Sequence, residues 1–293
     1  MVPVIAIHGG AGTIRKADMT ARRAALYKEG LGKALEAGNA VLRKGGTALD
    51  AVTAAVVAME DSPLFNAGRG AVYNAEGRHE LDAAIMDGST LRAGAVACVE
   101  RIRNPVLAAR AVMEHTRHVL LAGRGAEAFA GQRGLAMVSS KYFQTPERLA
   151  ALKRNLEGHH GTVGAVALDR DGNLAAATST GGYTGKLPGR IGDSPLVGAG
   201  TYADNRACAV SGTGLGELFI RALVAYDVVA RMRYRRESLA GAARAALANV
   251  ARLGGDGGLV AVDRRGNVAM PFNSQGMYRA CIDRRGRRTI AIY

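Results

Sequence analysis

The chain has 293 residues, of which 48% are hydrophobic and 22% charged, an ordinary globular composition for one large or two small domains. Its longest apolar run, 51–59, is too short to span a bilayer, and residues 1–12 lack the pattern of a signal peptide, so we expect a cytoplasmic protein without membrane contact. The formal charge is +14, yet the chain has no tryptophan and only 5% aromatic residues. The chain therefore has few aromatic side chains on which nucleic-acid bases could stack. We expect a solvated, arginine-rich surface and no nucleic-acid partner.

Strands and helices alternate in the first half of the chain. Strands are predicted at 3–7, 71–75, 81–87 and 93–100. Helices are predicted at 18–44, 47–60 and 104–114. Thr47 is a suitable N-cap for the second helix, and Pro105 suits the first position of the third.

Hairpins dominate the second half. They are predicted at 163–179, 259–271 and 281–293, each with a tight turn that begins with aspartate and contains glycine. Residues 214–252 between them predict two helices, the first beginning at 214. This order favours a layered α+β sandwich over a regular βαβ repeat.

The usual signatures of cofactor and metal sites are missing from this sequence. The glycine turn at 8–13 has neither the ending of a Walker loop nor the spacing of a dinucleotide fold. The cysteines at 98, 208 and 281 are far apart and have no metal-ligand spacing. All six histidines precede Thr162, whereas the densest polar, glycine-rich text follows it. His8 or His79 could still reach that region through the fold, so a histidine-based triad stays open.

Thr162 follows Gly161 at the mouth of a predicted strand. It is either an ordinary β-branched residue at the start of that strand or the new N-terminus of a chain that is cut there. A threonine with a free amine can use that amine as its own general base. An α-amino group has a pKa of about 7.7–8.0, so much of it is neutral near physiological pH.

Two further features could complete a site around such a nucleophile. Arg190 and Asp193 could clamp the carboxylate and ammonium of an α-amino acid, or they could be a surface ion pair of little energetic value. Thr213 and Gly214 precede a predicted helix, where backbone N–H groups could stabilise an oxyanion. The alternative is that Thr213 only caps that helix.

The sequence resembles the plant-type asparaginase/isoaspartyl peptidase family over nearly its whole length. The matching segments are 8–13, 62–74, 80–88, 103–113, 161–205 and 211–217. The resemblance implies a single-domain N-terminal-nucleophile hydrolase with a four-layer αββα sandwich. It also implies a precursor that cuts itself into chains 1–161 and 162–293, which remain together as an αβ pair and form a dimer of such pairs.

The resemblance also assigns roles to residues by position. The implied catalytic residues are Thr162 as nucleophile, Thr180 beside it, and the Thr213 hydroxyl and Gly214 N–H as the oxyanion hole. The implied substrate-binding residues are Arg190 for the α-carboxylate, Asp193 for the α-ammonium, and Thr213, Gly214, Leu215 and Gly216. The residues implied in self-cleavage are Gly161, Thr162 and Asn66. The reaction needs no cofactor, but a structural sodium ion is expected on the backbone carbonyls of Met59, Glu60, Ser62, Phe65, Ala67 and Arg69.

The implied activity is hydrolysis of the side-chain amide of L-asparagine and of the isopeptide bond in β-aspartyl dipeptides. Either substrate could be preferred. Alternatives within the same fold are an aspartylglucosaminidase-like or a threonine aspartase activity. An alternative of another class is a basic, non-catalytic protein that binds nucleic acid or anionic surfaces. The chain departs from the family at Arg69 and Leu215, and the segment before Thr162 is shorter than in many relatives.

Overall fold

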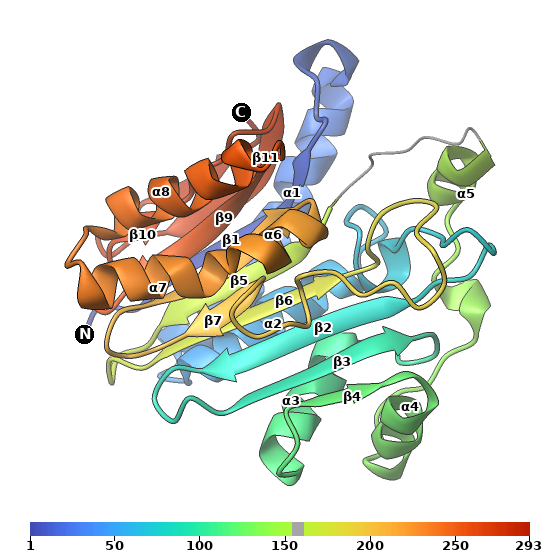
Figure 1. Ribbon diagram of the computed structural model, residues 1–293, viewed down its shortest axis with the longest axis horizontal. Coiled ribbons are helices and arrows are strands. Elements are labelled where there is room, and N and C mark those ends of the chain that lie inside the picture. The colour runs from blue at the N-terminus through green and yellow to red at the C-terminus, as the bar shows by residue number, and fades with distance from the viewer. Residues whose placement is uncertain (154–160) are drawn as a thin grey trace.

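The computed structural model describes residues 1–153 and 161–293. Within these residues the chain forms two sheets that lie between layers of helices (Figure 1). In the described residues the larger sheet has eight strands, in the order β12 (Arg288–Ala291), β11 (Gly276–Ile282), β1 (Val4–Gly12), β5 (Val163–Leu168), β6 (Leu174–Thr180), β2 (Leu81–Asp87), β3 (Ala93–Val99) and β4 (Leu120–Ala122). The smaller sheet of the described residues has four, in the order β10 (Val268–Ala269), β9 (Gly257–Asp263), β8 (Cys208–Gly214) and β7 (Thr201–Ala203).

Helices cover the outer faces of both sheets. The larger sheet packs against α1 (Ala21–Arg43), α2 (Ala48–Glu60) and α3 (Pro105–His115). The smaller sheet packs against α6 (Gly216–Ala222), α7 (Val224–Tyr234) and α8 (Leu239–Arg252). The chain also forms α4 (Gly123–Gln132) beside β3 and β4, α5 (Pro146–Lys153), and the short 3₁₀ turns η1 (Lys16–Asp18), η2 (Gly68–Gly70) and η3 (Ser140–Tyr142). The four-layer αββα sandwich is thereby confirmed.

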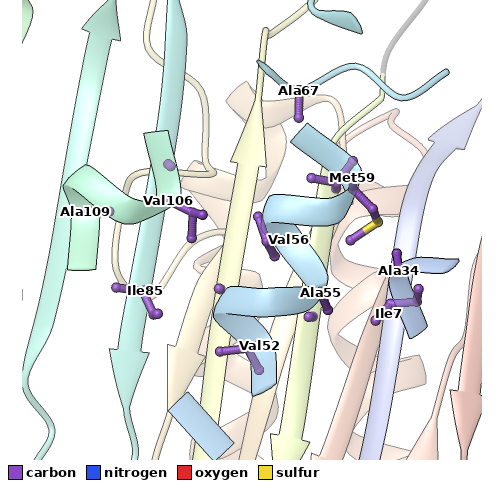
Figure 2. Packing of buried hydrophobic residues seen from close by; sticks show 14 of the residues in the cluster. Ile7, Ala34, Val52, Ala55, Val56, Met59, Ala67, Ile85, Val106 and Ala109 are labelled. Atoms are coloured by element: carbon purple, nitrogen blue, oxygen red, sulfur yellow. The ribbon is translucent and has the colours of Figure 1, made fainter. Parts of the chain in front are cut away.

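Each junction between layers has its own apolar core. One core joins α1, α2 and α3 to the larger sheet, a second joins α7 and α8 to the smaller sheet, and a third fills the space between the sheets. In the first core, Val52, Val56 and Met59 of α2 lie against the strands of the larger sheet (Figure 2). These side chains are fully buried, and each such burial contributes about 1.5–3 kcal/mol.

Most predicted elements are found. The helix predicted at 47–60 begins after Thr47, whose hydroxyl oxygen accepts a hydrogen bond from the Asp50 N–H at 3.1 Å. Two elements were predicted wrongly. Residues 71–75 form no strand but a loop with one bridge, between Asn74 and Lys186, because they pack against another loop. Residues 214–252 contain three helices, not two, because Leu223 takes a left-handed conformation with φ 45° between α6 and α7.

The larger sheet interleaves strands from both sides of Gly161. Strand β1 lies between β11 and β5, so Ile5 pairs with Ile282 on one side and Ala167 on the other. Two fragments produced by a cut after Gly161 could not separate without breaking these ladders. Sheet topology therefore supplies a physical reason for the expected fragments to stay together.

Several arginines of the basic stretches are paired with carboxylates. In the basic stretch 231–237, Arg231 bonds to Asp227 at 2.9 Å and Arg233 to Asp204 at 3.2 Å. Arg287 in the last hairpin bonds to Asp283 at 2.9 Å. Every helix of the described residues is too short or too polar to cross a membrane.

Candidate active site

Thr162 stands immediately before β5, and the pairing of β5 with β6 places Thr180 beside it. The Thr162 hydroxyl donates a hydrogen bond to Thr180 Oγ1 at 3.1 Å. Thr180 Oγ1 also accepts from the Gly182 N–H at 2.9 Å and donates to the Gly161 carbonyl at 3.0 Å. The nucleophile predicted from the sequence is therefore buried, with its hydroxyl held by a second threonine that contacts the carbonyl before it.

The Gly161 carbonyl has a second donor in Asn66. Its Nδ2 lies 2.7 Å from the Gly161 oxygen, and its Oδ1 accepts from the Val72 N–H at 2.9 Å. The latter bond fixes which end of the amide faces the carbonyl. Two donors on one carbonyl polarise its carbon and stabilise the negative oxygen that attack on that carbon would create.

His8 lies behind Thr162 but does not contact its hydroxyl. Its Nδ1–H donates to the Thr162 carbonyl at 2.8 Å, so its Nε2 accepts from the Ser211 hydroxyl at 2.8 Å. Burial lowers the pKa of His8 to about 3, so the ring is neutral. His79 contacts the Val72 carbonyl and stacks near Tyr73. Both histidines thus have partners other than the nucleophile, and a histidine-based triad finds no support in these contacts.

A small pocket opens beside Thr162 and brings together six of the predicted residues, namely Gly161, Thr162, Thr180, Arg190, Asp193 and Gly214. Its lining comprises Gly161, Thr162, Thr180, Gly182, Tyr183, Arg190, Asp193, Ser194 and Gly214. These residues come from the start of β5, the end of β6, the loop after it and the end of β8. Residues distant in sequence therefore converge around one hydroxyl.

Arg190 is held in this pocket by Glu217, a residue to which neither the sequence pattern nor the family resemblance assigned a role. Its Nε lies 2.9 Å from Glu217 Oε1, and its second terminal nitrogen lies 3.0 Å from Oε2. The guanidinium carbon lies 4.7 Å from the centre of the Tyr183 ring. A Cβ at Gly216 would come within 2.8 Å of the Arg190 guanidinium, so only glycine leaves it this space. The signal for Glu217 was its place on the first turn of α6, next to the predicted site residues.

Asp193 carries unused hydrogen-bonding capacity. Burial raises the pKa of its carboxyl to about 7. Its Oδ2 and the hydroxyl of Ser194 are both buried without a hydrogen-bond partner among the described residues. Unsatisfied buried polar atoms are costly and occur where a ligand or ion completes them.

Of the two predicted oxyanion-hole residues, Gly214 lies in the pocket lining and Thr213 lies outside it. Thr213 is fully buried one residue earlier, and its Oγ1 accepts from the Ala11 N–H at 3.1 Å, which leaves its own hydrogen free to donate elsewhere. Leu215 lies outside the pocket lining and packs on the core beneath α6. The helix predicted from 214 begins at Gly216.

Backbone hydrogen bonds close part of the loop 59–69, which was predicted to hold sodium. The carbonyls of Met59, Phe65 and Ala67 each accept a backbone N–H bond of 3.0–3.2 Å. Those of Glu60, Ser62 and Arg69 accept none from the described residues. A Cβ at Gly68 would stand 2.4 Å from the Glu60 carbonyl oxygen, so this carbonyl turns inward toward a glycine. Backbone oxygens without N–H partners are ligands that a hard cation accepts.

The Glu60 side chain points to other partners. Its Oε1 accepts from the Val106 N–H at 3.0 Å and the Ser179 hydroxyl at 2.7 Å. Burial raises the pKa of Glu60 to about 8, so the group is largely protonated at neutral pH. Among the described residues, no group of three or more His, Cys, Asp or Glu side chains could hold a metal ion.

Comparison with known proteins identifies the family. A family model described as Asparaginase matches residues 1–160 and 153–292. The chain therefore belongs to the asparaginase family represented by that model. It is 56% identical to the isoaspartyl peptidase of Salmonella typhimurium, over 94% of each chain. It is also 56% identical to the isoaspartyl peptidase of Escherichia coli K12, over 94% of this chain and 92% of that protein. Identity to an isoaspartyl peptidase/L-asparaginase of Danio rerio is 44%, over 94% of this chain and 91% of the relative.

Proposed function

We propose that this protein hydrolyses the side-chain amide of L-asparagine and the isopeptide bond of β-aspartyl dipeptides, with Thr162 as its nucleophile. The observation that carries the proposal is the pocket in which Thr162, Arg190 and Asp193 meet. The names of the relatives, isoaspartyl peptidase and L-asparaginase, support the same substrates.

Self-cleavage comes first. The Thr162 oxygen attacks the Gly161 carbonyl carbon, and Asn66 and Thr180 stabilise the resulting oxyanion through the two hydrogen bonds already present. The C–N bond then breaks, the hydroxyl proton passes to the Thr162 nitrogen, and an ester replaces the amide. Water hydrolyses that ester, leaving a carboxylate on Gly161 and a free amine on Thr162.

Substrate hydrolysis reuses the same oxygen. The Thr162 amine accepts the hydroxyl proton, and the oxygen attacks the β-carbonyl of the substrate. Thr213 and Gly214 donate to the oxyanion, and the loss of one such donor typically costs about 2.7–4 kcal/mol. The amine returns the proton to the departing nitrogen, and water then cleaves the β-aspartyl ester. Arg190 binds the α-carboxylate and Asp193 the α-ammonium, whose charge supplies the partner that Asp193 Oδ2 lacks.

Three further features belong to the proposal. A sodium ion bound by the carbonyls of the 59–69 loop would steady Asn66, which lies within that loop. The cut protein would form a dimer of αβ pairs and act in the cytoplasm, as the family resemblance implies. The interleaved strands of the larger sheet support the pairing of the two fragments.

Mass spectrometry of the purified protein, with an assay of ammonia release from L-asparagine, tests the proposal. We expect two fragments on a denaturing gel, the smaller one beginning at Thr162, and ammonia release that rises with the fraction cut. A smaller fragment that begins at another residue would overturn the proposal. Fully cut protein that hydrolyses neither L-asparagine nor a β-aspartyl dipeptide would do the same.

A further inference from the structure

A second cavity, of about 290 Å³, meets the substrate pocket at Gly161. Gly161 is the only residue that the two linings have in common in the described chain. Gly10 also lines the cavity; it lies near the end of β1, in the segment 8–13 that was predicted as a glycine turn but continues the strand to Gly12. A Cβ at Gly10 would lie 3.4 Å from the Thr162 nitrogen, so this lining glycine packs close to the atom that becomes the free amine.

The mechanism places the departing part of a substrate on this side of Thr162. The aspartyl part is held by Arg190 and Asp193 in the substrate pocket. The Thr162 amine must come within about 2.6–3.2 Å of the departing nitrogen to return its proton. That amine appears where Gly161 was attached, so the residue joined to the departing nitrogen extends toward the cavity that meets the pocket at Gly161. Ammonia from L-asparagine has no such residue.

The charges around the cavity suit a carboxylate. Its lining includes three arginines and two carboxylates, namely Arg15, Arg23, Arg148, Asp18 and Glu147. Arg148 is engaged by the backbone, since its Nε donates to the Gly70 carbonyl at 2.8 Å. Arg15 is paired with Asp18 at an exposed position. Arg23 donates from one terminal nitrogen to Glu147 at 3.2 Å, and a guanidinium has further donors to offer.

The cavity also has an apolar wall. Tyr27 of α1 stacks on Tyr278 of β11, with ring centres 4.2 Å apart and an interplanar angle of 14°. Both rings line the cavity together with Leu64. A side chain can pack against these groups while a carboxylate faces Arg23, whose guanidinium carbon lies 5.8 Å from the Tyr27 ring centre.

We infer that this cavity is the subsite for the departing residue of a β-aspartyl dipeptide, and that Arg23 binds the free carboxylate of that residue. Glu147 competes for the same guanidinium. The inference rests on the proposed function and adds to it a residue that recognises the free carboxylate of the departing residue. In the reaction, the isopeptide C–N bond breaks, the Thr162 ester forms, and the proton held by the amine goes to the departing nitrogen.

The test compares β-aspartyl-leucine, β-aspartyl-leucinamide and L-asparagine as substrates of the cut protein. Arg23→Ala should lower the ratio of kcat/KM for β-aspartyl-leucine to that for L-asparagine about fivefold, as expected for a partly exposed ion pair. The corresponding ratio for β-aspartyl-leucinamide should not fall, because its carboxylate is replaced by an amide. Glu147→Gln should raise the β-aspartyl-leucine ratio about twofold, because it frees the guanidinium and removes a negative charge.

Arg22→Ala is the matched control, because Arg22 is an exposed neighbour on α1 outside the cavity lining. Its ratios should equal those of the unaltered protein. The inference would be overturned if the Arg23→Ala ratios stay unchanged, or if they fall equally for β-aspartyl-leucine and β-aspartyl-leucinamide. The proposed function would still stand in that case, provided that the unaltered protein hydrolyses its substrates. Failure of the unaltered protein to cut itself and hydrolyse L-asparagine would instead defeat the proposed function.

Discussion

The two sides of Thr162 differ in how completely their polar groups are paired. On the side of Gly161, the carbonyl oxygen already holds hydrogen bonds from Asn66 and Thr180. On the side of Arg190, the Asp193 Oδ2 atom is buried with no partner in the described part of the chain. A bond within the chain can have its oxyanion donors in place from the outset. A site for a separate molecule must keep groups unpaired until that molecule arrives.

Thr162 serves both sides, so its loss should have the largest effect. Thr162→Ala removes the attacking oxygen from self-cleavage and from substrate hydrolysis. We expect one uncut chain on a denaturing gel and a loss of activity of roughly 10⁴-fold or more. Thr162→Ser keeps a hydroxyl and should still cut. A Thr162→Ala protein that cuts at the same bond would show that another group is the nucleophile.

Substitution of Asn66 should slow self-cleavage and leave substrate binding nearly unchanged. Asn66→Ala removes the donor 2.7 Å from the Gly161 oxygen, and the rate of self-cleavage should fall about 10²–10³-fold. Protein that has become fully cut should retain a KM for L-asparagine within about threefold of the original, because Arg190 and Asp193 are untouched. A time course on denaturing gels, followed by kinetics of the cut form, measures both effects. An unchanged cutting rate would remove Asn66 from the cleavage step.

Asp193 should give the smallest effect, seen as a pH dependence on the substrate side alone. Its carboxyl has a pKa of about 7 in the absence of substrate, so it is mostly neutral at pH 6 and mostly charged at pH 8. Binding of an ammonium requires the charged form. The KM for L-asparagine should therefore rise as pH falls, by about tenfold for each unit below 7. A KM that remains flat from pH 8 to pH 5.5 would contradict this role.

Local chemistry explains why much of the fold could be predicted. In the turns after β5, β9 and β11, an aspartate Oδ1 accepts N–H bonds from the second and fourth residues that follow; these aspartates are Asp169, Asp263 and Asp283. Each turn is closed by its own side chain, so its sequence suffices to identify it. The wrongly predicted strand at 71–75 has strand-like residues, but Gly185 and Lys186 of another loop take its hydrogen bonds.

Some features of the candidate site could likewise be predicted from the sequence, and others could not. Residue types and the family resemblance were enough to single out Thr162, Arg190 and Asp193. Neither the residue types nor the resemblance indicated that Glu217 would accept hydrogen bonds from Arg190. They also did not indicate that Asn66 and Thr180 would both donate to the Gly161 carbonyl.

The sequence by itself determined the helix cap at Thr47 and the hairpin turns, because each depends on neighbours a few positions away. Residue types and the family resemblance together indicated which residues can perform the chemistry. Only the tertiary structure decided which of those residues meet, which remain unpaired and where a departing group can go. Those outcomes depend on strand order and burial, which bring together atoms more than a hundred residues apart in the chain, as with His8 and Thr162.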